Sequence, residues 1–248
     1  MIELRGVSKR LGSKQVLDGL DLDVPTGITM VVLGRSGTGK SVLLKHIIGL
    51  MQPDEGTIHI DGEDIAHLKE AELDRVRRRF GMLFQGAALF DSLSVGENVA
   101  LPMREHMKLP EAEIQHRVAE RLSWVGLQDV EDMKPASLSG GMKKRVGLAR
   151  AVAIDPAYIL YDEPTTGLDP IMSDVINELI RSLQKRMGVT SVVVTHDLRS
   201  AWKVGDQLAL LHEGRVQFTG TPAEAEATGD RLMRQFIEGR SEGPVGAV

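Results

Sequence analysis

The stretch Gly34-Arg35-Ser36-Gly37-Thr38-Gly39-Lys40-Ser41 matches the phosphate-binding pattern G-x-x-x-x-G-K-[ST] at every position. An apolar run at residues 28–33 leads into it as a buried strand, and an apolar helical pattern begins near Lys40. In such a turn the glycines let backbone N–H groups surround the β- and γ-phosphates at the positive end of the helix. Lys40 would bridge phosphate oxygens, and the Ser41 hydroxyl would ligate magnesium. A glycine-rich turn without a ligand is the alternative, but the complete match in this setting predicts a nucleoside triphosphate site.

The composition narrows the possible function classes. The chain has 248 residues, enough for one large α/β domain. Its 30 basic and 35 acidic residues give a net charge of −5, so we expect no nucleic-acid partner. The lack of cysteine excludes disulfides and thiolate metal sites and is typical of the reducing cytoplasm. No apolar run reaches the roughly 20 residues of a membrane-spanning helix, and Met1 leads into a strand-like segment rather than a signal sequence. Any membrane role is therefore expected to depend on a partner.

The hydropathy pattern predicts an α/β fold. Alternation at residues 2–7 and 16–24 is typical of half-exposed antiparallel strands, and Asp61-Gly62 predicts a hairpin turn after residues 57–60. Apolar runs at 28–33, 157–161 and 191–194 indicate strands buried on both faces. We expect a P-loop NTPase core, with a mostly parallel sheet flanked by helices, an N-terminal antiparallel β subdomain and an inserted α-helical subdomain.

The insert and the tail define the expected subdivision. Between Gln85 and Pro156 the pattern is helical, with a capping box at Ser94–Glu97, Pro110 in a first turn and a helix from about Ser139. After a hairpin at Glu213-Gly214, the tail predicts one short amphipathic helix and a mobile Gly/Pro-rich end. We expect residues 1–85 and 157–218 to form the nucleotide-binding core, 86–156 the helical subdomain and 219–248 the short C-terminal helix and tail.

Two acids follow the apolar run at 157–161. Because acids at the carboxyl end of a parallel strand face the same crevice as the P-loop, Asp162 would hold magnesium and Glu163 would orient and deprotonate the attacking water. Two acids that merely end a strand in solvent are the alternative. His196, after the third buried run, is expected to sense the γ-phosphate, although a lone histidine there is more often structural. Gln85, after residues 81–84, is the further candidate near magnesium.

The segment Ser137-Leu138-Ser139-Gly140-Gly141-Met142 completes an ordered set of motifs. With the P-loop before it and Asp162-Glu163, Gly167-Leu168-Asp169 and His196 after it, the chain resembles the ATP-binding-cassette (ABC) ATPases over nearly its whole length. The resemblance implies ATP hydrolysis with Mg²⁺ in a head-to-tail homodimer. Ser139, Gly140 and Gly141 head a helix, so their hydroxyl and N–H groups would bind the γ-phosphate of the second copy's ATP. A plain glycine-rich helix cap is the alternative.

Two positions depart from the common family pattern. Arg10-Leu11-Gly12 offers no aromatic ring to stack on adenine, so Arg10 or Leu11 would cover the base, and Met142 replaces the usual glutamine of the signature. Neither change concerns phosphate, magnesium or water. An inactive regulatory cassette is the alternative, but intact Lys40, Asp162, Glu163 and His196 favour an active ATPase.

The runs at residues 84–93 and 97–106 indicate a subfamily. They contain Ala88-Leu89-Phe90-Asp91-Ser92 and Pro102-Met103-Arg104-Glu105-His106, which, with Met142 and the tail 235–245, are similar to ATPases of Mla/Mce-type lipid transporters. This resemblance implies an integral permease of the MlaE type, a periplasmic Mce-domain protein, a small STAS-type subunit and a peripheral location on the cytoplasmic side of the bacterial inner membrane. An importer ATPase for a small polar solute and a soluble ABC ATPase outside transport remain alternatives. The insert contains more apolar residues than a solvated connector requires: Leu89, Phe90, Leu93, Val99 and Leu101. Packing within the insert is expected for any single one of them, and the rest would line a groove for the permease.

Two basic runs give weaker evidence about function. Arg75-Val76-Arg77-Arg78-Arg79 is interpreted as a solvated helix face balanced by nearby acids. Lys143-Lys144-Arg145 would either tune the field at the partner's phosphate or lie in a solvated first turn.

Overall fold

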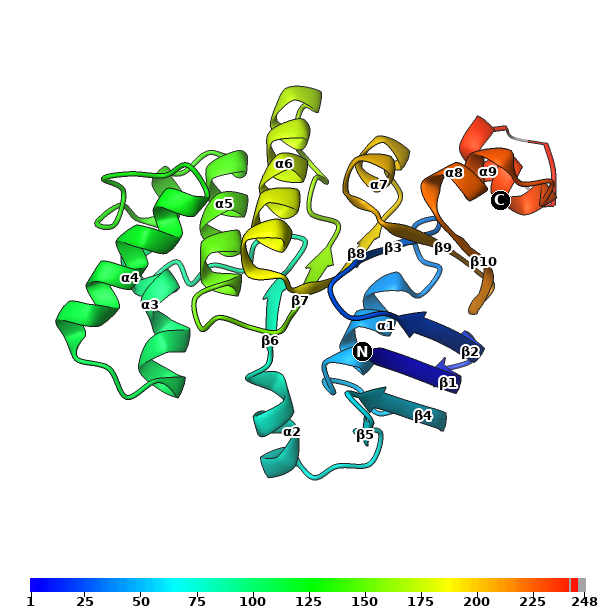
Figure 1. Cartoon of the computed structure of the whole chain (residues 1–248), viewed down its shortest axis with the longest axis horizontal. Helices are drawn as coiled ribbons and strands as arrows, with labels where there is room; N and C mark the ends of the chain where they lie inside the picture. The colour runs from blue at the N-terminus through cyan, green and yellow to red at the C-terminus, as the bar shows by residue number, and fades with distance from the viewer. Residues whose placement is uncertain (241, 245–248) are drawn as a thin grey trace. The chain divides into compact units, whose positions relative to one another are not determined.

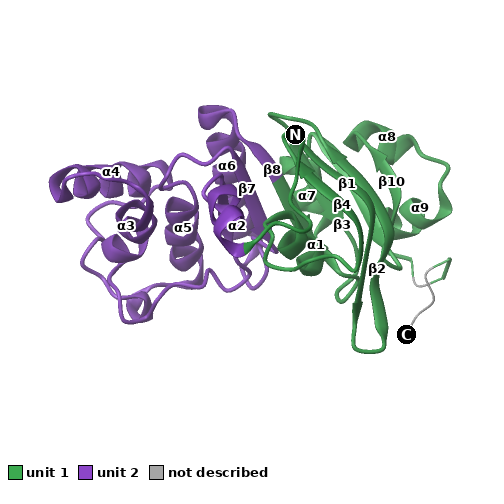
Figure 2. Ribbon diagram, turned by 90° about the horizontal axis from the view of Figure 1, so that it is seen from below, with its two compact units in different colours: residues 1–69, 192–248 green, residues 70–191 purple. Residues whose placement is uncertain are grey.

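The computed structural model describes residues 1–240 and 242–244, and it divides into two compact units (Figure 2). The first contains Met1–Lys69 and Val192–Val248, and the second contains Glu70–Ser191. The predicted boundaries at residues 85/86 and 156/157 separate functional subdomains, which differ from these two compact units. That subdivision stays a prediction.

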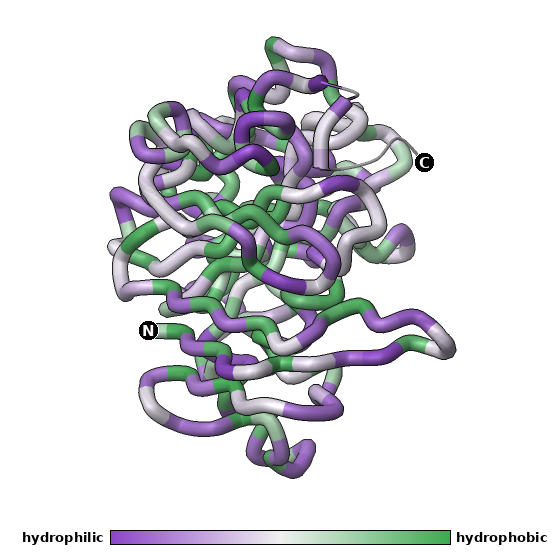
Figure 3. The backbone as a smooth tube through the Cα atoms, turned by 90° about the vertical axis from the view of Figure 1, so that its right-hand side faces the viewer, coloured by the Kyte–Doolittle hydropathy of each residue, from purple (hydrophilic) through white to green (hydrophobic). Residues whose placement is uncertain are grey.

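The first unit contains an antiparallel sheet near the N-terminus (Figure 1). Its strands are β1 (Ile2–Leu11), β2 (Lys14–Val24), β4 (Glu55–Ile60) and β5 (Glu63–Asp64), in the order β2-β1-β4-β5. In Figure 3 hydrophobic and hydrophilic colours alternate along the strand that starts at the N-terminus. The alternation places Ile2 and Leu4 in the core, as the sequence pattern predicts. The hairpin between β4 and β5, with its turn at Asp61-Gly62, is also confirmed.

The second sheet of this unit carries the phosphate loop. Its strands are β3 (Thr29–Leu33), β8 (Thr190–Thr195, of which residues 192–195 belong here), β9 (Gln207–His212) and β10 (Arg215–Gly220), in the order β10-β9-β3-β8. The central strand β3 is wholly buried and runs parallel to β9, as expected of a strand covered on both faces. The predicted hairpin at Glu213-Gly214 joins β9 to the antiparallel β10. The helices are α1 (Lys40–Ile47), α7 (Leu198–Val204), α8 (Pro222–Ala227) and α9 (Arg231–Glu238).

The tail differs from the prediction of a single helix, because α8 precedes α9. Thr221 and Glu224 form a capping box around Pro222, a start signal that the apolar pattern alone overlooks. The expected amphipathic helix is α9, which ends at Gly239. Of the Gly/Pro-rich end, 242–244 adopt bends, and Val245 lies outside the described residues.

The second unit is mainly helical. Its strands β6 (Phe80–Leu83) and β7 (Tyr158–Asp162) are parallel. Its helices are α2 (Glu70–Arg77), α3 (Val95–His106), α4 (Glu111–Trp124), the 3₁₀ turn η1 (Pro135–Ser137), α5 (Gly140–Ala151) and α6 (Pro170–Met187). Helix α5 packs against β6, α3 and α4 (Figure 1). A methyl group on Gly81 of β6 would come within 2.0 Å of the Ala151 carbonyl oxygen, so glycine is required for this approach.

The ends of these helices test the predicted caps. The Ser94–Glu97 capping box of α3 is confirmed. Pro110 was expected in a first turn, but it is the N-cap of α4 with ψ of 148°, one residue before the helix. On α2, Arg77 pairs with Glu70 and Asp74, which agrees with a charge-balanced helix face.

Candidate active site

The phosphate loop in the first unit follows β3 and ends at α1. Gly37 and Gly39 adopt φ of 78° and 103°, in the left-handed region that glycine enters without strain. Gly34 has no room for a side chain, because a Cβ there would lie 2.7 Å from the Leu211 carbonyl oxygen and 2.8 Å from Thr38 Oγ1. Two of the glycines are therefore required by backbone conformation and the third by space.

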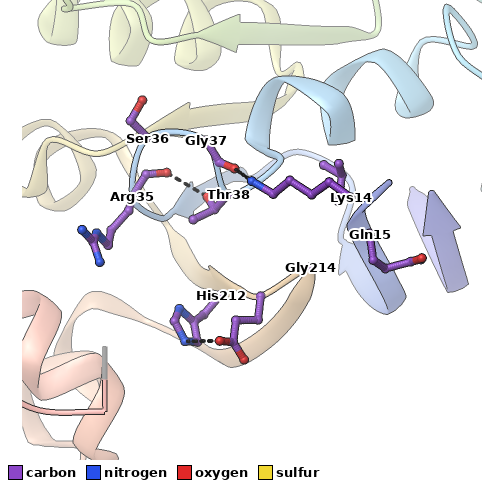
Figure 4. Close-up of a pocket in the computed structure, with 10 residues that line it drawn as sticks. Lys14, Gln15, Arg35, Ser36, Gly37, Thr38, His212 and Gly214 are labelled. Atoms are coloured by element: carbon purple, nitrogen blue, oxygen red, sulfur yellow. Dashed lines mark hydrogen bonds and ion pairs between the residues drawn. The ribbon is translucent and has the colours of Figure 1, made fainter. Parts of the chain in front are cut away.

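Lys40 closes this loop from inside. Its buried side chain folds back so that Nζ donates to the carbonyl oxygens of Gly34 at 2.8 Å and Arg35 at 3.0 Å. From outside, Lys14 Nζ donates to the Gly37 carbonyl at 3.2 Å (Figure 4). Two ammonium groups thus add positive charge to a loop at a helix N-terminus, which is the electrostatic requirement for binding phosphates.

A hollow of about 360 Å³ adjoins the loop (Figure 4). The side chains and backbone that line it come from the start of β2, the phosphate loop and the β9–β10 hairpin: Lys14, Gln15, Val16, Arg35, Ser36, Gly37, Thr38, His212, Glu213 and Gly214. None of these lining residues is Phe, Tyr or Trp. Neither Arg10 nor Leu11, the residues expected to cover a base, lines it, and Arg10 Nε instead donates to Gln15 Oε1 at 3.3 Å.

His196 lies in the same unit, exposed directly after β8. The chain behind it is anchored, because Asp197 caps α7 by accepting from the N–H groups of Arg199 and Ser200. The imidazole thus stands on a fixed backbone position, as a phosphate-sensing side chain would need to. Ser41 is in the first turn of α1, next to Lys40.

The acidic pair lies in the second unit at the end of β7. The side chains of Asp162 and Glu163 are both buried. Glu163 has φ of 48°, unusual for a residue with a side chain. Its Oε2 accepts from Thr166 Oγ1 at 3.2 Å, and its carbonyl oxygen accepts from the Thr166 N–H. The pair is therefore fixed by the chain rather than projecting loosely into solvent, which was the alternative.

The signature segment and Gln85 belong to the same unit. Ser139 is the N-cap of α5, and its Oγ accepts from the Met142 N–H at 3.3 Å, so the hydroxyl proton can still be donated. The first turn of α5 has no acid, and Ser139 and Gly140 are exposed. This helix start can therefore receive an anion. Gln85 is exposed just after β6.

Lys144 differs from its sequence-based interpretation. Only 5% of the residue is exposed, so the interpretation as part of a solvated first turn is wrong. Its Nζ donates to the carbonyl oxygens of Gln85 at 2.5 Å and Glu163 at 3.1 Å. Burial lowers the pKa of this ammonium, and the charges of Asp162 and Glu163 oppose that effect. Its spacing from Gly141 and Leu148 along the buried face of α5 is the signal that could have identified it.

Two groups of site residues therefore exist, one in each unit. The first holds the phosphate loop with Lys40, Ser41 and His196, and the second holds Gln85, the signature start and the acidic pair. Residues 17–166, more than half of the chain, match the family described as ABC transporter. The chain belongs to the ABC transporter family.

Curated relatives of this ABC protein match it from end to end. It is 44% identical over 246 residues to the "Probable ribonucleotide transport ATP-binding protein mkl" of Mycobacterium leprae, covering 99% of this chain and 71% of that protein. It is 42% identical over 245 residues to the "Intermembrane phospholipid transport system ATP-binding protein MlaF" of Haemophilus influenzae, covering 99% and 93%. The MlaF of Escherichia coli is 40% identical, covering 99% and 91%. The expected resemblance to Mla-type ATPases is confirmed.

Solved structures confirm the expected fold. The ATP-binding cassette MJ0796, in a dimeric post-hydrolysis state bound to ADP and Pi, superposes with a TM-score of 0.83 at 34% identity, covering 89% of this chain and 98% of that one. The cbiO1 protein of Clostridium perfringens, part of the ABC transporter complex cbiONQ, also gives 0.83 at 30% identity, covering 95% and 94%. This chain is an ABC transporter ATPase, so the expected enzyme class is confirmed. Across residues 1–240 and 242–244 no helix has the length and apolarity to cross a membrane.

Proposed function

We propose that this ABC ATPase drives lipid transport across the bacterial cell envelope as the ATPase of an Mla/Mce-type system. The observation that carries the proposal is the match to MlaF, which has 42% identity and includes 93% of that protein's length. A match of this extent includes the insert at residues 84–106, where an ABC ATPase would meet its permease, as well as the shared nucleotide motifs.

A second candidate is import of a small polar solute. The relatives named mkl, with 44% identity, bear the name of a ribonucleotide transport protein. The two candidates share the ATPase chemistry and differ in the cargo that the permease carries. An assay must therefore measure cargo rather than hydrolysis alone.

The chemistry is assigned to residues of both groups. The Lys40 ammonium would exchange its two loop carbonyls for phosphate oxygens, and the buried Glu163 carboxylate would accept a proton from the attacking water. His196 would contact the γ-phosphate. These roles supply positioning and charge, which is most of what phosphoryl transfer requires of a protein.

Magnesium fits the donor set. Within the described ranges, no three His, Cys, Asp or Glu residues gather as a dedicated metal site. Mg²⁺ in NTP sites is usually held by one or two protein carboxylates, together with substrate phosphates and water. Asp162 would provide such a carboxylate, and Ser41 and Gln85 would provide further oxygens. When bound, the ion would neutralise charge that develops on the phosphates.

The second copy would complete each site. The ATP-binding cassette MJ0796 was solved as a dimer, and here the anion-ready start of α5 suits the γ-phosphate held by another copy. Ile171, in the first turn of α6 after the Gly167-Leu168-Asp169 loop, is 79% exposed. Its side chain would leave water if a second copy packed against the start of α6, which is favourable for an apolar group. Both features support a head-to-tail homodimer.

The permease would dock at the loop before α3. Phe90 is 53% exposed there, whereas Val99 is fully buried in the core of its own unit. The expected groove therefore reduces to Phe90 and its half-buried neighbours. The proposed partners are an MlaE-type permease, through it a periplasmic Mce-domain protein, and a STAS-type subunit, with the ATPase bound peripherally on the cytoplasmic side of the inner membrane.

The test is reconstitution of the chain with its co-purified integral membrane partner in proteoliposomes. We expect ATP-dependent transfer of a fluorescent phospholipid and no uptake of labelled ribonucleotide. The Glu163→Gln variant, which lacks the proton acceptor but keeps the shape of the side chain, should bind ATP and transfer nothing. Nucleotide uptake without lipid transfer would reject the lipid proposal in favour of the second candidate, and wild-type hydrolysis by Glu163→Gln would remove Glu163 from its assigned role.

A further inference from the structure

Glu163 and two residues that follow Gln85 adopt an unusual backbone conformation. Ala87 and Ala88, just after Gln85, have φ of 61° and 48°, and Glu163 has φ of 48°. Residues with a β-carbon rarely occupy this left-handed region, because the β-carbon crowds the following carbonyl. Such backbone persists only where surrounding contacts hold it, and it is often found at functional sites.

Two cations of α5 are among the contacts that hold it. Lys144 donates to the carbonyl oxygens of Gln85 and Glu163. Arg150 donates to those of Ala87 at 2.6 Å and Ala88 at 2.7 Å. Every carbonyl oxygen concerned belongs to one of the three left-handed residues or to Gln85.

The geometry of α5 suits this arrangement. Gly147 lies between the two cations, and a Cβ on it would approach Leu83 Cδ1 to 2.7 Å and Ala87 Cβ to 3.4 Å. The absence of a side chain therefore lets the loop after β6 lie close to the helix. An ammonium has three N–H donors, enough to bind two separate carbonyls from one buried position.

Of these two cations, Lys144 is the one that contacts both Gln85 and Glu163. Arg150 contacts the loop alone, whereas Lys144 joins that loop to the end of β7. It does so from the helix whose first residues form the signature start. If α5 shifted, the Lys144 side chain would transmit that shift to the backbone of both residues.

We propose that Lys144 is a positioning residue for ATP hydrolysis, which holds the main chain of Gln85 and Glu163 in their active arrangement from the signature helix. The proposal rests on the role assigned to Glu163 above. In this role Lys144 acts through the main chain, because its Nζ donates to two backbone carbonyl oxygens. Its loss should therefore lower the rate of hydrolysis and leave ATP binding by the phosphate loop intact.

The experiment compares Lys144→Met, Lys144→Arg and the control Lys108→Met in the full-length chain. Lys108 is an exposed lysine between α3 and α4 with no assigned role. We expect Lys144→Met to lower kcat about tenfold or more, with the Kd for ATP within about threefold of wild type. Hydrogen–deuterium exchange should rise in segments 85–88 and 163–166. Lys144→Arg keeps the charge and should recover kcat to within about threefold of wild type, while Lys108→Met should match wild type.

Three results would overturn the proposal. The first is kcat of Lys144→Met within about twofold of wild type, and the second is a loss of ATP affinity as large as the loss of kcat. The third is unchanged exchange in both segments. If Lys144→Met does not fold, Lys144→Leu, which also removes every donor, is held to the same criteria. A wild-type chain that does not hydrolyse ATP would contradict the proposed function instead, and the exchange readout would still decide the role of Lys144.

Discussion

Asn98 is fully buried on α3, and its amide holds the loop that displays Phe90. Oδ1 accepts from the Phe90 N–H at 2.8 Å, and Nδ2 donates to the carbonyl oxygens of Ser94 at 2.9 Å, Phe90 at 3.1 Å and Leu93 at 3.4 Å. Asn98→Ala would remove all four bonds and leave their backbone partners without the amide.

The expected cost follows from these distances. Each of the three shorter bonds contributes about 1 kcal/mol net, and the longest one adds little. We therefore expect Asn98→Ala to lower the free energy of unfolding by about 3 kcal/mol. For a chain of this length that corresponds to a fall in Tm of about 6–12 °C.

Urea unfolding followed by circular dichroism measures this loss. The control is Gln115→Ala, which removes an exposed amide of α4 that donates only to Glu111, and it should cost less than about 0.5 kcal/mol. A loss below about 1 kcal/mol for Asn98→Ala would show that the amide does not hold the loop, and the reasoning from the four contacts would be refuted.

Three further substitutions test other parts of the structure. The guanidinium carbons of Arg121 and Arg186 lie 3.9 Å and 4.8 Å from the centroid of the Trp124 ring. Trp124→Leu should therefore lower the free energy of unfolding in urea by about 2 kcal/mol, and a loss below about 0.5 kcal/mol would contradict a role for these contacts. Burial lowers the pKa of His46 in the folded chain. As the pH falls through about 6.5, the unfolded chain therefore binds a proton at this residue that the folded chain does not bind. The free energy of unfolding consequently decreases with acidification. His46→Gln should reduce the difference in urea midpoint between about pH 7.5 and about pH 5.5, and an unchanged difference would assign the acid sensitivity to other groups. Lys40→Ala should weaken ATP binding about tenfold or more in equilibrium titration, and unchanged affinity would contradict the phosphate-loop assignment.

Most of the fold and the motif positions could be predicted because their signals are local. The phosphate loop needs glycine at Gly37 and Gly39 for conformation and at Gly34 for space, so the requirement is written in consecutive residues. Buried strands and hairpin turns have equally short patterns. The site residues follow from these, since each is expected at the start or the end of a recognisable element.

What could not be predicted depends on contacts distant in sequence. Lys144 reads as one of three consecutive basic residues, and only the packing of α5 reveals that it is buried against the Gln85 and Glu163 carbonyls. The left-handed conformation of Ala87 and Ala88 has no sequence signal, because alanine is not a residue that favours it. The helix α8 escapes a prediction from apolar periodicity for a different reason, since it is short and its apolar pattern is weaker than that of α9.

The exposed isoleucine at the head of α6 has a practical consequence. Because the sequence lacks cysteine, Ile171→Cys would give the chain a single thiol, at a position that is open to solvent in the monomer. A maleimide dye or a bifunctional thiol reagent would then attach at one known site. Site-specific chemistry of this kind could follow, in real time, whether two chains approach each other when ATP is added and part once it is spent.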